Sequence, residues 1–223
     1  MGYRLENREI ELSGLRKLNF VPSTKAGDVY RYKNVALRVF RDGEMPIEEE
    51  TAKYFTGITT KRILLPKKLL FYNNAFHGYT MKLVSQKGAG KRITTTPKWD
   101  LIDNVEVLEE DTETLSQKHI LLNGITPGYT LFNGELYIVN PAAHSIFEGG
   151  DTRQLNDLNQ YQLHLLMTEL IASDLRKSGV SQTEIQYMKK LMSAKDPEQY
   201  CSDYLREIMA GQNNVRELVK KIS

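Results

Sequence analysis

The stretch that decides the fold is Leu121-LNGITPGYTLFNGELYIVN-Pro141. Its first part, from Asn123 to Gly128, is predicted to be a loop, since Asn, Gly and Pro favour turns. Two apolar runs follow and meet at Asn133-Gly134. Asn-Gly between apolar runs is the strongest short-range signal for a β-hairpin. The stretch therefore predicts a loop that leads directly into a hairpin.

Helices are predicted on both sides of this stretch. Apolar residues recur at helical spacing from about Lys98 to His119, which predicts one long amphipathic helix. From Asp151 to Ile171 the apolar face is broad, as in a helix buried at the centre of a domain. Three shorter helices are expected around Ile185–Met192, Tyr200–Ile208 and Val215–Ile222.

The first third of the chain is predicted to hold five strands and one helix. The strand signals are short aromatic or β-branched runs separated by turns, at Leu15–Val21, Val29–Tyr32, Val35–Phe40, Ile63–Tyr72 and Phe76–Val84. The helix is expected after Pro46, because Glu48-Glu49-Glu50 suits a first helical turn. A connector at residues 85–97 separates the β-rich unit, 1–84, from the helical unit, 98–223.

This order of elements resembles the protein-kinase fold, an α+β fold with two lobes. The resemblance implies a small five-strand N-lobe with one helix and a mainly helical C-lobe that contains a β-hairpin. Val35-Ala36-Leu37-Arg38 is similar to the family's V-A-x-K strand, with Arg38 in place of the phosphate-pairing Lys. Glu50 stands where the family has the partner of that Lys. Met81 is similar to the gatekeeper residue, and Leu83 follows it into the hinge.

The catalytic positions of the family are replaced in this chain. Residues 121–131 are similar to H-R-D-L-K-P-x-N-I-L, which places Gly124 at the catalytic Asp, or Asn123 if the register slips by one. Tyr129 takes the place of the metal-binding Asn, and Asn140 that of the D-F-G Asp. Gly has no side chain and Asn is a poor proton acceptor, so neither replaces a carboxylate base. Mg²⁺ prefers hard, compact oxygen ligands.

We therefore expect no metal site and no cofactor. ATP binding without the usual magnesium site stays open, and the candidate nucleotide contacts are Arg38, Glu50, Met81, Leu83 and Asn140.

Two further segments depart from the family pattern. Residues 22–27 contain one glycine where the family has G-x-G-x-x-G, so fewer backbone N–H groups can approach a phosphate. The chain between Asn140 and Asp157 is too short for a full activation segment. Asp157 itself resembles the acidic residue found early in the following helix of kinases.

Other reactive residues are interpreted as structural. His119 follows the apolar stripe of its helix and is predicted to pack in the core. His144 is expected at a loop surface, with a position facing the cleft as the alternative. The histidines are dispersed, so zinc is not expected. Cys201 lies on an apolar helix face without a visible base partner and is read as inert.

Charge and composition limit the function classes. A net charge of +2 is too small an excess to indicate a nucleic-acid partner. No apolar run reaches the roughly 18 residues of a membrane helix, and the charged N-terminus does not resemble a signal peptide. With a single cysteine no internal disulfide can form, and a cytoplasmic location is expected.

Three functions remain open. The leading hypothesis is a non-catalytic, pseudokinase-like binding or regulatory module that acts through contact with an unidentified protein partner. The first alternative is an atypical small kinase or phosphotransferase that binds ATP by a non-standard geometry, with Glu50, Asp28 or Glu135 as metal ligands. The second is an accessory structural protein of unrelated α+β fold.

Overall fold

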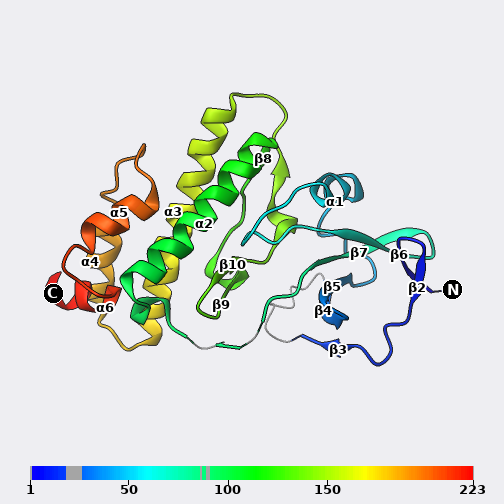
Figure 1. The fold of residues 1–223 in the computed structure, drawn as a ribbon, viewed down its shortest axis with the longest axis horizontal. Helices are drawn as coiled ribbons and strands as arrows, with labels where there is room; N and C mark the ends of the chain where they lie inside the picture. Colours follow the sequence, from blue (N-terminus) through cyan, green and yellow to red (C-terminus); the bar gives the residue numbers. More distant parts are fainter. Residues whose placement is uncertain (1, 19–26, 86, 89–90, 223) are drawn as a thin grey trace.

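The chain forms a sheet half and a helical half joined by an extended connector (Figure 1). The computed structural model describes residues 2–18, 27–85, 87–88 and 91–222. The sheet half ends at residue 82 and the helical half begins at residue 98. The two chain ends lie at opposite ends of the molecule, the N-terminus beside the sheet and the C-terminus beside the last helices.

The described residues of the sheet half form seven strands, so the predicted five-strand lobe is wrong in number. The strands are β1 (Tyr3–Leu5), β2 (Arg8–Ile10), β3 (Arg16–Lys17), β4 (Gly27–Tyr32), β5 (Val35–Phe40), β6 (Lys68–Tyr72) and β7 (Ala75–Lys82). They form one antiparallel sheet in the order β2-β1-β6-β7-β5-β4-β3. All five predicted strands have a counterpart, and the difference is the additional hairpin β1–β2.

The β1–β2 hairpin escaped prediction because each strand has only three residues. Its Leu5 and Ile10 join a small second core on one face of the sheet, against Leu37, Val39 and Leu70. The turn at Glu6 has φ 54°, a left-handed conformation. Two such short runs carry too few alternations to indicate a strand by themselves.

Strand β6 begins five residues later than predicted. Pro66 cannot donate a ladder hydrogen bond and interrupts the run. The residues before it pair with the helical half instead, through a parallel bridge between Ile63 and Ile138. The N–H of Leu64 donates to the carbonyl of Ile138 at 2.8 Å. This segment therefore joins the two halves rather than extending the sheet.

The helices agree with the sequence periodicity. They are α1 (Glu49–Thr56), α2 (Lys98–Gln117), α3 (Thr152–Lys177), α4 (Gln182–Met192), α5 (Cys201–Ile208) and α6 (Val215–Ile222). Helices α2 and α3 run side by side through the helical half (Figure 1). Helix α4 begins with a capping box between Ser181 and Glu184, which satisfies N–H groups that the first turn leaves open.

The predicted hairpin is confirmed as β9 (Thr130–Phe132) and β10 (Leu136–Ile138). A second small ladder pairs β8 (Ile120–Leu121) with β11 (Ser145–Ile146). Two short 3-10 turns, η2 (Pro127–Tyr129) and η3 (Pro141–Ala143), also belong to this half, and a third, η1 (Ile93–Thr95), lies in the connector. In the described part of the chain, no helix is both long and apolar enough to cross a bilayer.

The prediction for His119 is wrong. Helix α2 ends at Gln117, and His119 has φ 48° in the turn that follows. The change of chain direction turns its side chain outward, and the residue is exposed. The helical spacing that suggested burial stops two residues before it.

Candidate functional site

The loop between β8 and η2 is held in place by a buried amide on α3. Asn159 is fully buried, and its Oδ1 accepts from the N–H of Leu122 at 2.7 Å. Its Nδ2 donates to the carbonyl of Ile120 at 2.9 Å and to Ser116 Oγ at 2.8 Å. Asp157, which the resemblance placed in this region, is exposed. Asn159 is therefore the residue that binds the loop, and sequence reasoning missed it because a polar residue in a helix resembles a solvent-facing one.

Gly124 and Asn123 pack against the segment that follows the hairpin. Gly124 has φ 59°, and a Cβ added there would lie 2.8 Å from the Cβ of Ala143. Asn123 donates through Nδ2 to Ser145 Oγ at 3.0 Å. Of the two positions considered for the catalytic base, Gly124 has no side chain, and the side-chain amide of Asn123 is hydrogen-bonded to Ser145.

Tyr129 and Asn140 lie at the two ends of the hairpin. The N–H of Val139 donates to the carbonyl of Tyr129 at 2.9 Å, so Asn140 follows directly on a residue bonded to Tyr129. Asn140 is buried, with 8% of its surface exposed. The structure therefore places Asn140 one residue beyond the backbone contact between the two ends of the hairpin.

Arg38 and Met81 lie in the middle of the sheet. Arg38 is 1% exposed and Met81 is fully buried. Arg38 stands opposite Tyr79 in the β5–β7 register. Burial raises the pKa of Tyr79, while the charge of Arg38 and a hydrogen bond to it act in the opposite direction. Leu83 is half-buried against the core just beyond β7.

Glu50 does not lie with these residues. It is exposed in the first turn of α1, and no ion pair joins it to another described residue. It lines a groove of about 810 Å³ between α1 and the segment 142–148.

His144 lies on the inner wall of the same groove, so its predicted surface position is wrong. It is 4% exposed, because the η3 turn directs the chain back under α1. Burial lowers the pKa of His144 to about 4, although the nearby Asn123 backbone favours the protonated ring. That contact falls short of a hydrogen bond, and neither ring nitrogen has a partner in the described structure.

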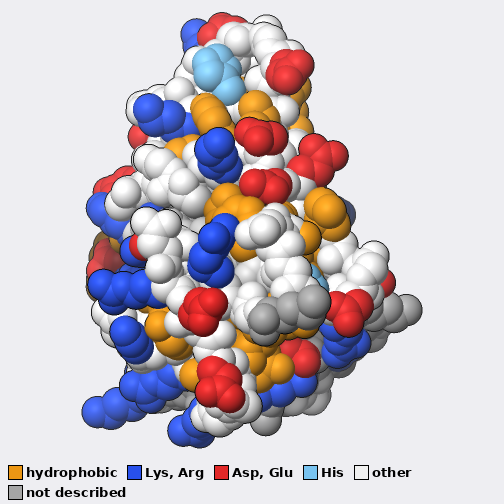
Figure 2. Space-filling model, turned by 90° about the vertical axis from the view of Figure 1, so that its right-hand side faces the viewer, with side chains coloured by type: hydrophobic (Ala, Val, Ile, Leu, Met, Phe, Trp, Pro, Cys, Tyr) orange, Lys and Arg blue, Asp and Glu red, His pale blue; other side chains and the backbone are white. Residues whose placement is uncertain are grey.

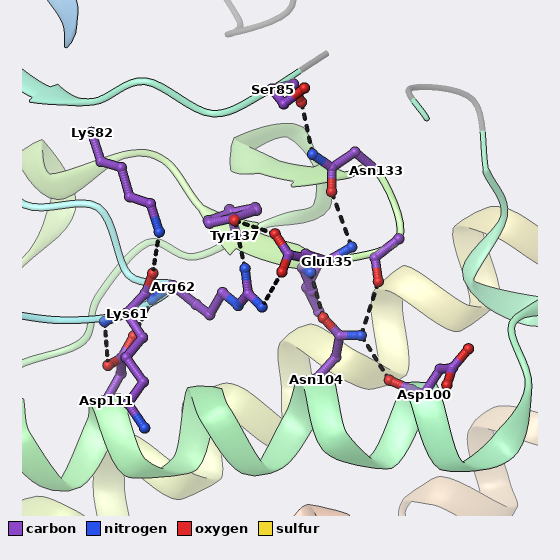
Figure 3. A network of polar contacts seen from close by, with 12 residues as sticks. Lys61, Arg62, Lys82, Ser85, Asp100, Asn104, Asp111, Asn133, Glu135 and Tyr137 are labelled. Atoms are coloured by element: carbon purple, nitrogen blue, oxygen red, sulfur yellow. Dashed lines mark hydrogen bonds and ion pairs between the residues drawn. The ribbon is translucent and has the colours of Figure 1, made fainter. Parts of the chain in front are cut away.

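A network of polar side chains on and above α2 joins the two halves (Figure 3). The Asp111 carboxylate accepts from the N–H groups of Lys61, Arg62 and Ile63 at 2.7, 2.6 and 2.8 Å. About two turns earlier on the same helix, Asn104 accepts from the N–H of Leu136 at 2.6 Å and so holds the hairpin. Buried side chains of one helix therefore hold both the segment that joins the two halves and the hairpin.

The Arg62 guanidinium extends this network over the hairpin. It lies 4.8 Å from the centre of the Tyr137 ring and pairs with Glu135 at 2.6 Å. The hydrogen bond from Arg62 is the main cause that lowers the pKa of Glu135 to about 2. Asp28 is likewise paired with Lys17 at 2.7 Å. Two of the three carboxylates considered as alternative metal ligands are thus already bound to cations of the chain.

Two other sequence interpretations can be placed. Cys201 is buried at the start of α5, and burial raises the pKa of its thiol, which disfavours the reactive thiolate. Most of the segment 22–27, compared with the glycine-rich loop, lies outside the described residues. Among the residues that are described, no three His, Cys, Asp or Glu side chains are grouped as metal ligands would be.

Comparison with known proteins supports the fold. No protein-family model matches the sequence, and no curated protein matches it. Among solved structures, the chain is similar to the PknI kinase domain of Mycobacterium tuberculosis, with a TM-score of 0.55 and 13% identity over 94% of this chain and 97% of that one. A variant of that domain, with one cysteine replaced by alanine, gives a TM-score of 0.52 and 14% identity over 96% of each chain. At such low identity the similarity shows the fold alone, and on that evidence this chain has an α+β, protein-kinase-like fold.

Proposed function

We propose that this chain is a non-catalytic, kinase-like module that acts by binding another protein. The observation that carries the proposal is the identity of the residues at three sites of the fold. Gly124 and Tyr129 lie in the loop before the hairpin, and Asn140 follows the hairpin. None of them is a carboxylate, whereas phosphoryl transfer in kinases depends on an Asp base and on charged metal ligands.

The atypical-kinase alternative finds less support. It needs carboxylates elsewhere, and Asp28 and Glu135 are each bonded to cationic side chains. A carboxylate with its pKa held near 2 by an arginine would have to give up that partner to bind a metal. Glu50 is the remaining candidate, and one exposed carboxylate supplies few of the ligands that Mg²⁺ needs.

Contact with another protein is favoured by the surface of α3. Leu158, Tyr161 and Leu165 are 46%, 54% and 40% exposed. Their spacing of three and four residues places them on one side of the helix. Contiguous exposed apolar side chains are typical of sites of protein contact.

Thermal unfolding with ATP, in the presence and absence of Mg²⁺ or Mn²⁺, tests the proposal. A ligand that binds only the folded chain raises its melting temperature, so we expect no metal-dependent increase. The variant Asn140→Ala is the matched control. A stabilisation that requires the metal and disappears in Asn140→Ala would overturn the non-catalytic assignment.

A further inference from the structure

The groove beside α1 is formed by two walls from opposite halves of the molecule. One wall is α1 with the residues just before it, from Pro46 to Tyr54, and the other runs from Ala142 to Glu148. Tyr54 Oη donates to the carbonyl of Lys118 at 3.0 Å, which ties α1 to the end of α2. At about 810 Å³, the groove has room for several side chains.

Acidic side chains dominate its charge. Glu48, Glu50 and Glu148 line the groove together with one cation, Lys53, although the chain as a whole has a net charge of +2. In Figure 2, acidic and hydrophobic side chains lie next to each other in the upper half of the face, with Lys and Arg side chains among them. The groove is therefore a local acidic feature on a slightly basic protein, and it favours a cationic ligand.

His144 provides a second, independent sign of a ligand. Its ring is buried in the inner wall, and neither nitrogen has a hydrogen-bond partner in the described structure. A buried polar group without a partner costs free energy, commonly of about 1–3 kcal/mol. A ligand N–H that reaches the imidazole would remove that cost.

The edge of β11 offers a backbone surface on the same side. Ser145 and Ile146 both line the groove, although neighbouring residues of a strand point to opposite faces. The groove therefore follows the edge of the strand. The N–H of Phe147 donates to the backbone carbonyl of His119 at 2.6 Å, so these two residues form a hydrogen-bonded pair of the ladder. In an antiparallel ladder, the residue next to such a pair directs its N–H and C=O groups away from the partner strand. Ile146 is such a residue.

We propose that this groove binds an extended peptide segment of a partner protein and takes an arginine or lysine side chain of that segment between α1 and β11. The peptide backbone would pair with the edge of β11 that no described strand occupies, as in strand-addition modes of recognition. Its cationic side chain would meet Glu50 and Glu148, and its N–H would reach the buried nitrogens of His144 through a shift of the inner wall. The inference rests on the proposed function and deepens it by giving the chemistry of the partner.

Fluorescence anisotropy with a labelled arginine-containing heptapeptide tests the inference, and the same peptide with citrulline in place of arginine is the ligand control. Citrulline keeps the shape of the side chain and removes its charge. We expect the arginine peptide to bind, the citrulline peptide to bind at least tenfold more weakly, and added salt to weaken the arginine peptide by screening.

The variants separate the groove from the overall charge of the protein. Glu50→Gln and Glu148→Gln should each weaken the arginine peptide about three- to tenfold, as expected for the loss of one charge at a binding rim. Glu49→Gln removes the same charge from the same helix, but Glu49 does not line the groove, so it should bind as the unchanged chain does. Equal binding of the two peptides, equal effects of the three variants, or no binding at all would each overturn the inference.

Failure here and failure of the proposed function are distinguishable. Metal-dependent ATP binding in the thermal titration would refute the non-catalytic assignment, whatever the peptide does. If ATP with metal leaves the melting temperature unchanged and the arginine peptide does not bind, only the assignment of the groove is wrong.

Discussion

The backbone N–H of Ile63 donates to the carboxylate of Asp111 at 2.8 Å, across 48 positions of the sequence. Asp111 lies on α2 in the helical half and is 2% exposed, whereas Ile63 follows α1 in the sheet half. The same carboxylate accepts from two further N–H groups of this segment. One side chain thus satisfies three backbone donors where the two halves meet.

Replacing Asp111 should strongly destabilise the chain. Asp111→Ala leaves three backbone N–H groups without their acceptor. A hydrogen bond to a charged group contributes about 1.5–3 kcal/mol. Two of the three contacts are only partly buried, so water can replace part of what is lost. We expect a loss of about 2–4 kcal/mol in the free energy of unfolding, measured by urea denaturation.

The neighbouring Glu110 gives the matched control. It is exposed and pairs with Lys61 of the same segment. Exposed ion pairs contribute about 0–1 kcal/mol, so Glu110→Ala should change stability by no more than that. Similar losses in the two variants would show that the buried acceptor has no special role.

A second prediction concerns Asn159. Asn159→Leu removes the partner of the Leu122 N–H and of the Ile120 carbonyl, which are buried where β8 leads into the loop. Leaving buried polar groups without partners costs about 1–3 kcal/mol each, so we expect a loss of about 2–4 kcal/mol in thermal or urea unfolding. Asp157→Asn, two residues away and exposed, should stay within about 0.5 kcal/mol of the unchanged chain.

The large elements of this fold could be predicted because they repeat a pattern over many residues. Helix α2 carries buried apolar residues along its whole length. The Asn133-Gly134 pair predicts the turn of the β9–β10 hairpin. Hairpin β1–β2 could not be predicted, since three-residue strands show little alternation and are defined by pairing with β6, more than 60 residues away.

The polar contacts that position the candidate site could not be predicted from the sequence either. Asp111 and Asn159 sit in helices, where a polar residue normally faces water. Only tertiary structure shows that each meets unpaired backbone groups of another segment. The same holds for His144, which belongs to a loop by sequence but lies beneath α1 in the structure. Gly124, Tyr129 and Asn140 lie close to the hairpin in the chain, so their place beside it follows from the hairpin alone, whereas their comparison with the kinase motif positions stays a prediction.

A third prediction is that acid destabilises the chain through His144. Its pKa is about 4 in the folded chain and 6.5 in the reference state. Because the folded value is the lower one, the unfolded chain binds the proton first, and stability present above pH 6.5 is lost as the pH falls toward 4. From these values the loss between about pH 7 and 5 is about 2 kcal/mol.

The variant His144→Leu should flatten this part of the pH profile of the free energy of unfolding. His164 shifts in the same direction, because burial also lowers its pKa, so part of the slope remains. His119→Gln, at an exposed position, should retain the full slope. A slope unchanged by His144→Leu would show that the ring is already protonated or solvated in the folded chain.

The last prediction concerns Gly124, the position compared with the catalytic base. Its φ of 59° disfavours residues with a Cβ, and an added Cβ would lie 2.8 Å from that of Ala143. Gly128, in the same loop, has no such constraint, since the nearest atom to an added Cβ is Thr126 Oγ1 at 3.7 Å. We expect Gly124→Ala to lose about 1–3 kcal/mol in urea unfolding, whereas Gly128→Ala should be neutral or stabilise by up to about 1 kcal/mol. Gly124→Asp meets the same obstacle, so restoring the carboxylate should cost stability before it could assist any chemistry. Equal stability of the two alanine variants would show that the loop can move away from Ala143, and a carboxylate at position 124 would then be sterically tolerated.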